Sequence, residues 1–250
     1  MRRFVLFGTV LFLLMTVFIF SMTENNSKIS IVNPKEEKSM ELIFILDRSG
    51  SMGGLESDTI GGYNSMLEKQ KNGKTGKVNV TTVLFDDKYE LLHDRIPIKE
   101  IKPITDKEYY VRGNTALLDA IGKTVSHIKS EQNKLEKEKK SEKVMFIIIT
   151  DGMENASKEY TVKAVKEIIE TQKNKEKWEF LFLGANIDAI GTAESYGIDS
   201  SRAVQYKSDS RGTINNYEVL EKAIENVREG KELDEKWKKE IEEDVKNRGQ

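Results

Sequence analysis

The stretch Leu42-Ile43-Phe44-Ile45-Leu46-Asp47-Arg48-Ser49-Gly50-Ser51-Met52 decides the fold of this chain and indicates where its functional site lies. A short, wholly apolar run is typical of a parallel strand that is buried on both faces. The run ends in three oxygen-bearing side chains on alternate residues, Asp47, Ser49 and Ser51. Open α/β sheets bind ligands at the carboxyl ends of such strands. One carboxylate and two hydroxyls suit a hard divalent cation such as Mg²⁺.

Taken alone, this pattern has a second explanation, because Asp and Ser are also preferred as caps at the start of a helix. Two later segments favour the metal site. Gly113-Asn114-Thr115 places a hydroxyl just before a helical pattern, and Ile147-Ile148-Ile149-Thr150-Asp151-Gly152 is a second buried-strand pattern that ends in Asp.

At these residues the chain resembles a von Willebrand factor type A (VWA) domain. The metal-ion-dependent adhesion site of that family consists of D-x-S-x-S, a distant Thr and a distant Asp, which correspond here to Asp47, Ser49, Ser51, Thr115 and Asp151. The resemblance covers residues 40 to 229. It implies a doubly wound, mostly parallel α/β sheet with helices on both faces, similar to a Rossmann fold. It also implies a bound Mg²⁺, Mn²⁺ or Ca²⁺ ion.

The function that the resemblance implies is protein binding in adhesion or assembly, not catalysis. Two carboxylates that are not both directly bound under-neutralise the cation and leave it electrophilic, so an acidic side chain of a partner protein can replace a bound water as a further oxygen ligand. The alternative is a metal-dependent hydrolase that uses the same site. Hydrolysis also needs a positioned general base, and the sequence contains no phosphatase D-x-D, P-loop or G-x-S-x-G motif. The sequence therefore favours binding.

The composition excludes several other classes of protein. The 250 residues include 40 Lys and Arg and 42 Asp and Glu, a net charge of −2 that gives no basic signal for nucleic acid. Cysteine is absent and only His93 and His127 are present, so thiolate and histidine-rich metal sites are excluded. The length permits one large domain or two small ones, and the continuous alternation of strand and helix patterns favours one. None of these features sets the oligomeric state.

The N-terminal segment is far more apolar than the rest of the chain. Arg2 and Arg3 precede an apolar segment over residues 4 to 22, and a helix of that length spans about 28 Å, close to the hydrocarbon thickness of a bilayer. We predict that residues 1–22 form an uncleaved membrane anchor, because no small-residue cleavage site follows. The two arginines then stay in the cytoplasm and the domain lies outside. A cleaved signal peptide with secretion is the second interpretation, and a cytoplasmic product starting at Met40 is the third.

Beyond a polar linker over residues 23–39, strand patterns alternate with helix patterns. Strands are expected over 41–46, 78–85, 144–150, 178–184 and 203–206, with an antiparallel return at 89–92, and helices over 55–71, 117–129, 160–174, 186–196 and 214–228. Gly61 and Gly62 inside the first helix predict close packing or an irregular start. A charged C-terminal helix over 230–250 carries Leu233, Trp237, Ile241 and Val245 at i, i+4 spacing. This stripe is predicted to pack back on the domain.

Several acidic positions have competing interpretations. Asp86-Asp87 is interpreted as a hairpin turn rather than another metal site. Asp119 is interpreted as an acid favoured by the helix macrodipole, rather than as a support for the metal ligands. Glu154 and Asn155, just after Asp151, either shape the rim of the site or are ordinary polar loop residues.

Overall fold

The computed structural model describes residues 39–73 and 76–249. Its centre is a six-stranded sheet in the order β3-β2-β1-β4-β5-β6, in which only the edge strand β3 runs antiparallel to its neighbour. The strands are β1 (Ser39–Asp47), β2 (Lys77–Phe85), β3 (Tyr89–Pro97), β4 (Lys143–Thr150), β5 (Glu179–Gly184) and β6 (Ala203–Gln205). The α-helices are α2 (Glu56–Lys71), α3 (Leu117–Lys134), α4 (Val162–Glu176), α5 (Ala189–Ser195), α6 (Ser210–Arg228) and α7 (Lys239–Arg248).

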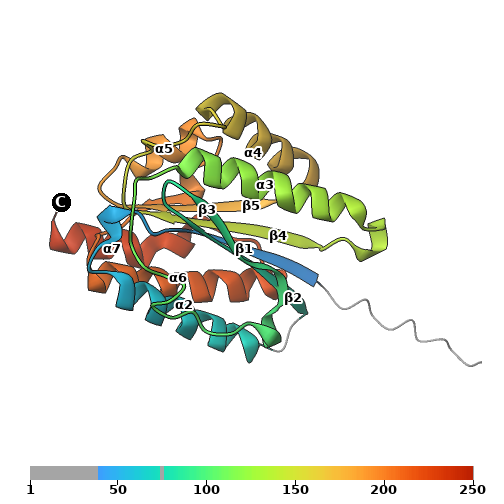
Figure 1. Cartoon of the computed structure of the whole chain (residues 1–250). Coiled ribbons are helices and arrows are strands. Elements are labelled where there is room, and N and C mark those ends of the chain that lie inside the picture. The colour runs from blue at the N-terminus through green and yellow to red at the C-terminus, as the bar shows by residue number, and fades with distance from the viewer. Residues whose placement is uncertain (1–38, 74–75, 250) are drawn as a thin grey trace, which may run out of the picture. The chain divides into compact units, whose positions relative to one another are not determined.

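Helices cover both faces of the sheet, with α3, α4 and α5 on one side and α2, α6 and α7 on the other (Figure 1). The central strand β1 is therefore buried on both faces. Leu42, Phe44 and Leu46 pack in the hydrophobic cluster under α2 and α6, whereas Ile43 and Ile45 pack in the cluster under α3 and α4. This two-sided burial explains why the run shows no alternation of polar and apolar residues. The predicted α/β fold with a mostly parallel sheet is confirmed.

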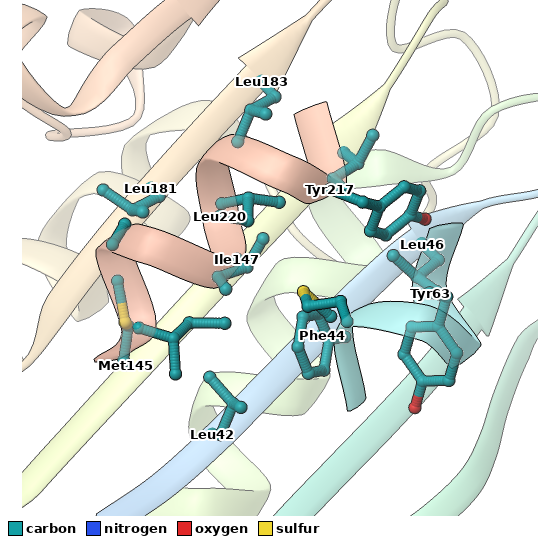
Figure 2. Close-up of a cluster of buried hydrophobic side chains, with 14 of the residues drawn as sticks. Leu42, Phe44, Leu46, Tyr63, Met145, Ile147, Leu181, Leu183, Tyr217 and Leu220 are labelled. Atoms are coloured by element: carbon teal, nitrogen blue, oxygen red, sulfur yellow. The ribbon is translucent and has the colours of Figure 1, made fainter. Parts of the chain in front are cut away.

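The contact between α2 and α6 is unusually close. Figure 2 shows Phe44 of β1, Tyr63 of α2 and Tyr217 of α6 in the cluster beneath these helices, where the Phe44 and Tyr63 rings meet edge to face with centroids 5.3 Å apart. A Cβ atom on Gly62 would lie 2.3 Å from the Tyr217 ring, whereas one on Gly61 would meet nothing within 4 Å. The prediction of close packing is confirmed for Gly62.

The segment after α6 packs back on the domain, as predicted. Leu233 and Ile241 are buried in the same cluster as α6, and Trp237 packs against it while its Nε1 donates to the Ser201 carbonyl at 2.9 Å. The segment is not one helix, because a 3₁₀ turn over Glu235–Lys238 precedes α7. Lys238 ties this turn to the sheet, since its Nζ donates to the carbonyl oxygens of Ser200, just before β6, and of Ala203, the first residue of β6.

Within the described ranges, no helix combines the length and the apolar character needed to cross a membrane. The anchor or signal segment predicted over residues 1–22 lies outside the described residues, and so does nearly all of the linker predicted over 23–39.

The sheet topology places a ligand-binding position between β1 and β4. From β1 the chain continues to β2 on one side, and from β4 it continues to β5 on the other side. The carboxyl ends of two neighbouring strands whose connections diverge are the usual ligand-binding position of open α/β sheets. Asp47 ends β1 and Thr150 ends β4, so the acidic motifs meet at this point.

Candidate metal site

The five predicted ligands all lie at the carboxyl edge of the sheet. Asp47 is the last residue of β1, Asp151 directly follows β4, and Thr115 lies two residues before α3. Ser49 and Ser51 belong to the loop that leaves β1. The structure brings the three hydroxyls together, because Ser49 Oγ lies 3.1 Å from Ser51 Oγ and accepts a hydrogen bond from Thr115 Oγ1 at 3.0 Å.

Asp47 is held in one orientation from both sides. Its Oδ1 accepts from the Ser49 amide at 2.7 Å and its Oδ2 accepts from Thr150 Oγ1 at 2.6 Å. Burial raises the pKa of Asp47 to about 6, although these hydrogen bonds oppose the shift, and the charge of Asp151 raises the pKa further. The two carboxylates are therefore close enough to repel each other.

Among the residues that the structure describes, only one of the two carboxylate oxygens of Asp151 has a hydrogen-bond partner. Its Oδ2 accepts from Ser208 Oγ at 3.0 Å, and the Asn186 side chain donates to its carbonyl oxygen at 3.3 Å. Its Oδ1 is buried, and no donor among the described residues reaches it. A buried carboxylate oxygen of this kind is stable beside a cation. The next residue, Gly152, has no side chain to displace Ser51 and Thr115, since a Cβ there would lie 3.1 and 3.3 Å from their hydroxyl oxygens.

The donor set fits a hard divalent cation. Its side chains supply two carboxylates and three hydroxyls, all oxygen ligands of the kind that Mg²⁺, Mn²⁺ and Ca²⁺ accept. A cation between the two carboxylates also offsets their mutual repulsion. Across residues 39–73 and 76–249, no three His, Cys, Asp or Glu side chains are grouped to hold a metal. A metal at this edge therefore depends on the hydroxyls as well as on the carboxylates.

Glu154 and Asn155 hold the loop that carries Thr115. Asn155 Oδ1 accepts from the Thr115 amide at 2.9 Å, and the Asn155 amide donates to the Thr115 carbonyl at 3.0 Å. Glu154 accepts from the Leu118 amide at 2.9 Å, so it binds the start of α3. The sequence pattern leaves the roles of Glu154 and Asn155 open because these partners are far away along the chain.

Two other acids also support the site over long range. The Asp119 carboxylate accepts from the amides of Lys158, Glu159 and Tyr160 at 2.8–2.9 Å. Its interpretation as only a helix-start acid is therefore wrong, because it ties α3 to the loop after β4. The Asp86 turn is confirmed by its bond from the Lys88 amide at 2.7 Å, but its carboxylate is also buried between two arginines.

Removing the charge of Asp47 is expected to stabilise the metal-free domain at neutral pH. The native pKa of about 6 lies above the ordinary value of 3.8. The protonated carboxyl therefore stabilises the wild type below about pH 4, and this contribution is lost as the pH rises through about 6. In Asp47→Asn the Oδ1 still accepts from the Ser49 amide, and the Nδ2 donates to Thr150 Oγ1, whose hydroxyl then donates to the Gly152 carbonyl 3.3 Å away. At about pH 8 in EDTA we therefore expect its free energy of unfolding to exceed that of wild type by about 1–3 kcal/mol, at about 1.4 kcal/mol per pKa unit.

Urea denaturation in EDTA at several pH values measures this difference in the free energy of unfolding. The gain should shrink toward zero near pH 4. A gain that stays constant with pH would contradict the raised pKa of Asp47.

Comparison with known proteins supports the fold. The sequence matches no protein-family model, and it matches no curated protein. Among solved structures, the PilB minor pilin from Streptococcus sanguinis is similar with a TM-score of 0.55 at 10% identity, over 77% of this chain and 63% of the pilin. The manganese-loaded TRAP protein of Plasmodium vivax gives 0.50 at 15% identity, over 72% of each chain. A von Willebrand factor type A structure from Catenulispora acidiphila gives 0.51 at 12% identity, over 75% of this chain and 42% of that one.

The chain has a VWA-like fold. At 10–15% identity the likeness concerns the fold alone. This chain also spans less than two thirds of the pilin's length.

Proposed function

We propose that this chain is a divalent-metal-dependent protein-binding module for adhesion or assembly. The observation that carries the proposal is the convergence of the five oxygen ligands at the ends of β1 and β4, with the buried Asp151 Oδ1 lacking a donor among the described residues. The fold it shares with a pilin and with a manganese-loaded TRAP protein supports the same function.

The spacing of the hydroxyl oxygens fits Mg²⁺ or Mn²⁺ as the ion. Ser49 Oγ lies 3.1 Å from Ser51 Oγ and 3.0 Å from Thr115 Oγ1. Adjacent ligands of an octahedral Mg²⁺ ion are about 3.0 Å apart, given a metal–oxygen distance of about 2.1 Å. The hydroxyls, which hydrogen-bond to one another, are already at this spacing.

The charges of the ligand set explain how a partner is recognised. Asp47 and Asp151 supply two negative charges, and the three hydroxyls supply none, so the protein balances a divalent ion without adding further negative charge. A bound ion supplies an electrophilic position for one more hard oxygen ligand. A carboxylate of a partner protein is the ligand that this position favours.

The surrounding residues favour binding over hydrolysis. The Glu154 carboxylate accepts hydrogen bonds from three amides and from Ser157 Oγ, so its lone pairs are already engaged. His93 pairs with Thr82, and His127 pairs with Asp94 at the surface. The Glu154 carboxylate is therefore saturated, and among the described residues neither histidine hydrogen-bonds to any of the five candidate ligands, where hydrolysis would require its general base.

The proposal also places the domain outside the cytoplasm. It rests on the apolar sequence over residues 4–22 and on the arginines before it, Arg2 and Arg3, which favour a cytoplasmic N-terminus.

The function is tested by selecting displayed random peptides on the immobilised full-length chain, in Mn²⁺ and in EDTA. We expect Asp- or Glu-containing peptides to be enriched in Mn²⁺ alone, and the enrichment to be lost in Thr115→Ala. Thr161→Ala is the matched control, because Thr161 also precedes a helix but caps α4 by accepting from the Ala164 amide. Enrichment that is independent of metal would contradict the proposal. Turnover of a chromogenic phosphate ester that requires Mn²⁺ and Asp151 would favour the hydrolase.

A further inference from the structure

We propose that Arg48, Asp86 and Arg112 form a positioning network that fixes Thr115 and thereby makes the site select small divalent cations. The inference rests on the proposed metal-binding function. It concerns residues that supply no ligand themselves.

Arg48, inside the D-x-S-x-S motif, is completely buried. Its Nε donates to Asp86 Oδ2 at 3.0 Å, its Nη1 donates to the Glu108 carbonyl at 3.2 Å, and its Nη2 donates to Glu90 Oε2 at 2.7 Å. A buried guanidinium is tolerated only when it is paired and hydrogen-bonded in this way. Arg48 therefore joins the loop after β1 to β3 and to the segment that leads toward Thr115.

Asp86 binds a second arginine, Arg112, through the same carboxylate oxygen that binds Arg48. Arg112 Nε donates to Asp86 Oδ2 at 2.7 Å, so one carboxylate oxygen accepts from two guanidinium groups. Both guanidinium groups also lie against the Tyr110 ring, 5.3 and 5.2 Å from its centroid. These contacts hold residues 110–112 against the end of β2.

Backbone hydrogen bonds fix the chain on both sides of Thr115. The Arg112 amide donates to the Arg48 carbonyl at 2.9 Å, and the Gly50 amide donates to the Gly113 carbonyl at 3.2 Å. On the other side, the Ala116 amide donates to the Asp86 carbonyl at 2.9 Å. The position of Thr115 relative to Ser49 thus depends on Asp86 through both its side chain and its backbone.

A rigid Thr115 affects which cation binds, because small ions and Ca²⁺ differ in how much variation of the coordination geometry they tolerate. Mg²⁺ and similarly small ions need near-ideal octahedral geometry at short distances, whereas Ca²⁺ accepts longer and more variable ones. Holding Thr115 Oγ1 in a fixed position relative to Ser49 Oγ favours the ions that need fixed geometry, which are the small ones. Loosening the network should therefore weaken Mn²⁺ binding more than Ca²⁺ binding.

The test compares Mn²⁺ and Ca²⁺ affinities of the full-length wild type and Asp86→Asn by calorimetry. Changing a residue that orients metal ligands typically lowers affinity about 10- to 100-fold, and we expect a loss in this range for Mn²⁺ and a smaller loss for Ca²⁺. In a Thr115→Ala background, Asp86→Asn should have little further effect on Mn²⁺ affinity, because it acts through Thr115. Equal losses for both ions, or independent effects of the two substitutions, would overturn the proposal.

A second readout needs no metal. In EDTA, amide hydrogen exchange over residues 110–117 should rise in Asp86→Asn while exchange in α4 stays unchanged. Asp94→Asn is the matched control, because Asp94 pairs with His127 at the surface and should alter neither readout. If Asp86→Asn does not fold, Glu90→Gln removes the negative charge of a half-exposed partner of Arg48 instead.

The two readouts separate this proposal from the proposed function. A wild type that binds no metal would refute the function. Unchanged exchange over residues 110–117 in the variant would refute the network, whatever the metal result.

Discussion

Asp151→Ala is expected to lower Mn²⁺ affinity by more than about 100-fold, beyond the loss typical of residues that only orient ligands. Asp151 supplies one of the two negative charges of the site, and its buried Oδ1 has no donor among the described residues. In EDTA the same variant should unfold at the wild-type temperature or above it. It loses one hydrogen bond from Ser208, but it also removes the negative charge of Asp151, which adds to the rise that burial causes in the pKa of Asp47. Calorimetric titration and thermal unfolding of the full-length chain measure the two effects.

Asp188→Ala is the matched control for this experiment. Asp188 lies at the same edge of the sheet, but its exposed carboxylate caps α5 by accepting from the Gly191 amide at 2.9 Å. We expect it to lose about 1 kcal/mol of stability, as helix caps usually do, and to bind Mn²⁺ like wild type. If Asp151→Ala binds Mn²⁺ like wild type, the carboxylates of β1 and β4 do not hold the ion.

Gly62→Ala and Gly61→Ala are expected to change stability in opposite directions, although the two glycines are neighbours in α2. At Gly62 the new Cβ would lie 2.3 Å from the Tyr217 ring, so the buried ring or the two helices must shift. Overpacking of this kind lowers the free energy of unfolding by about 1–3 kcal/mol. At Gly61 the Cβ meets nothing within 4 Å, and replacing Gly by Ala inside a helix raises stability by about 0.5–1 kcal/mol.

Chemical denaturation of the two variants beside wild type measures the difference. Adding Tyr217→Leu to Gly62→Ala makes room for the methyl group, so Gly62→Ala should cost less in the Tyr217→Leu background than in wild type. Equal effects of the two alanine substitutions would show that α2 and α6 do not approach at Gly62.

Most elements were predictable because their signals are local. The buried runs before Asp47 and Asp151 have no alternation, and this pattern correctly predicted β1 and β4. The start of α6 was predicted late, at residue 214 instead of Ser210. Its first turn contains Gly212, which weakens the helical pattern, whereas the informative signal was Asp209, which accepts from the Gly212 amide at 2.9 Å.

The sequence by itself determined the alternation of strands and helices and the candidate ligands Asp47, Ser49, Ser51, Thr115 and Asp151, because strand ends and short motifs are properties of neighbouring residues. Only the tertiary structure decided which residues hold those ligands in place. The bonds from Arg48 to Asp86, from Thr115 to Asn155 and from Tyr160 to Asp119 join residues 38, 40 and 41 positions apart. Periodicity along a chain records which face of an element is buried, and it carries no information about which loops meet once the strands are paired.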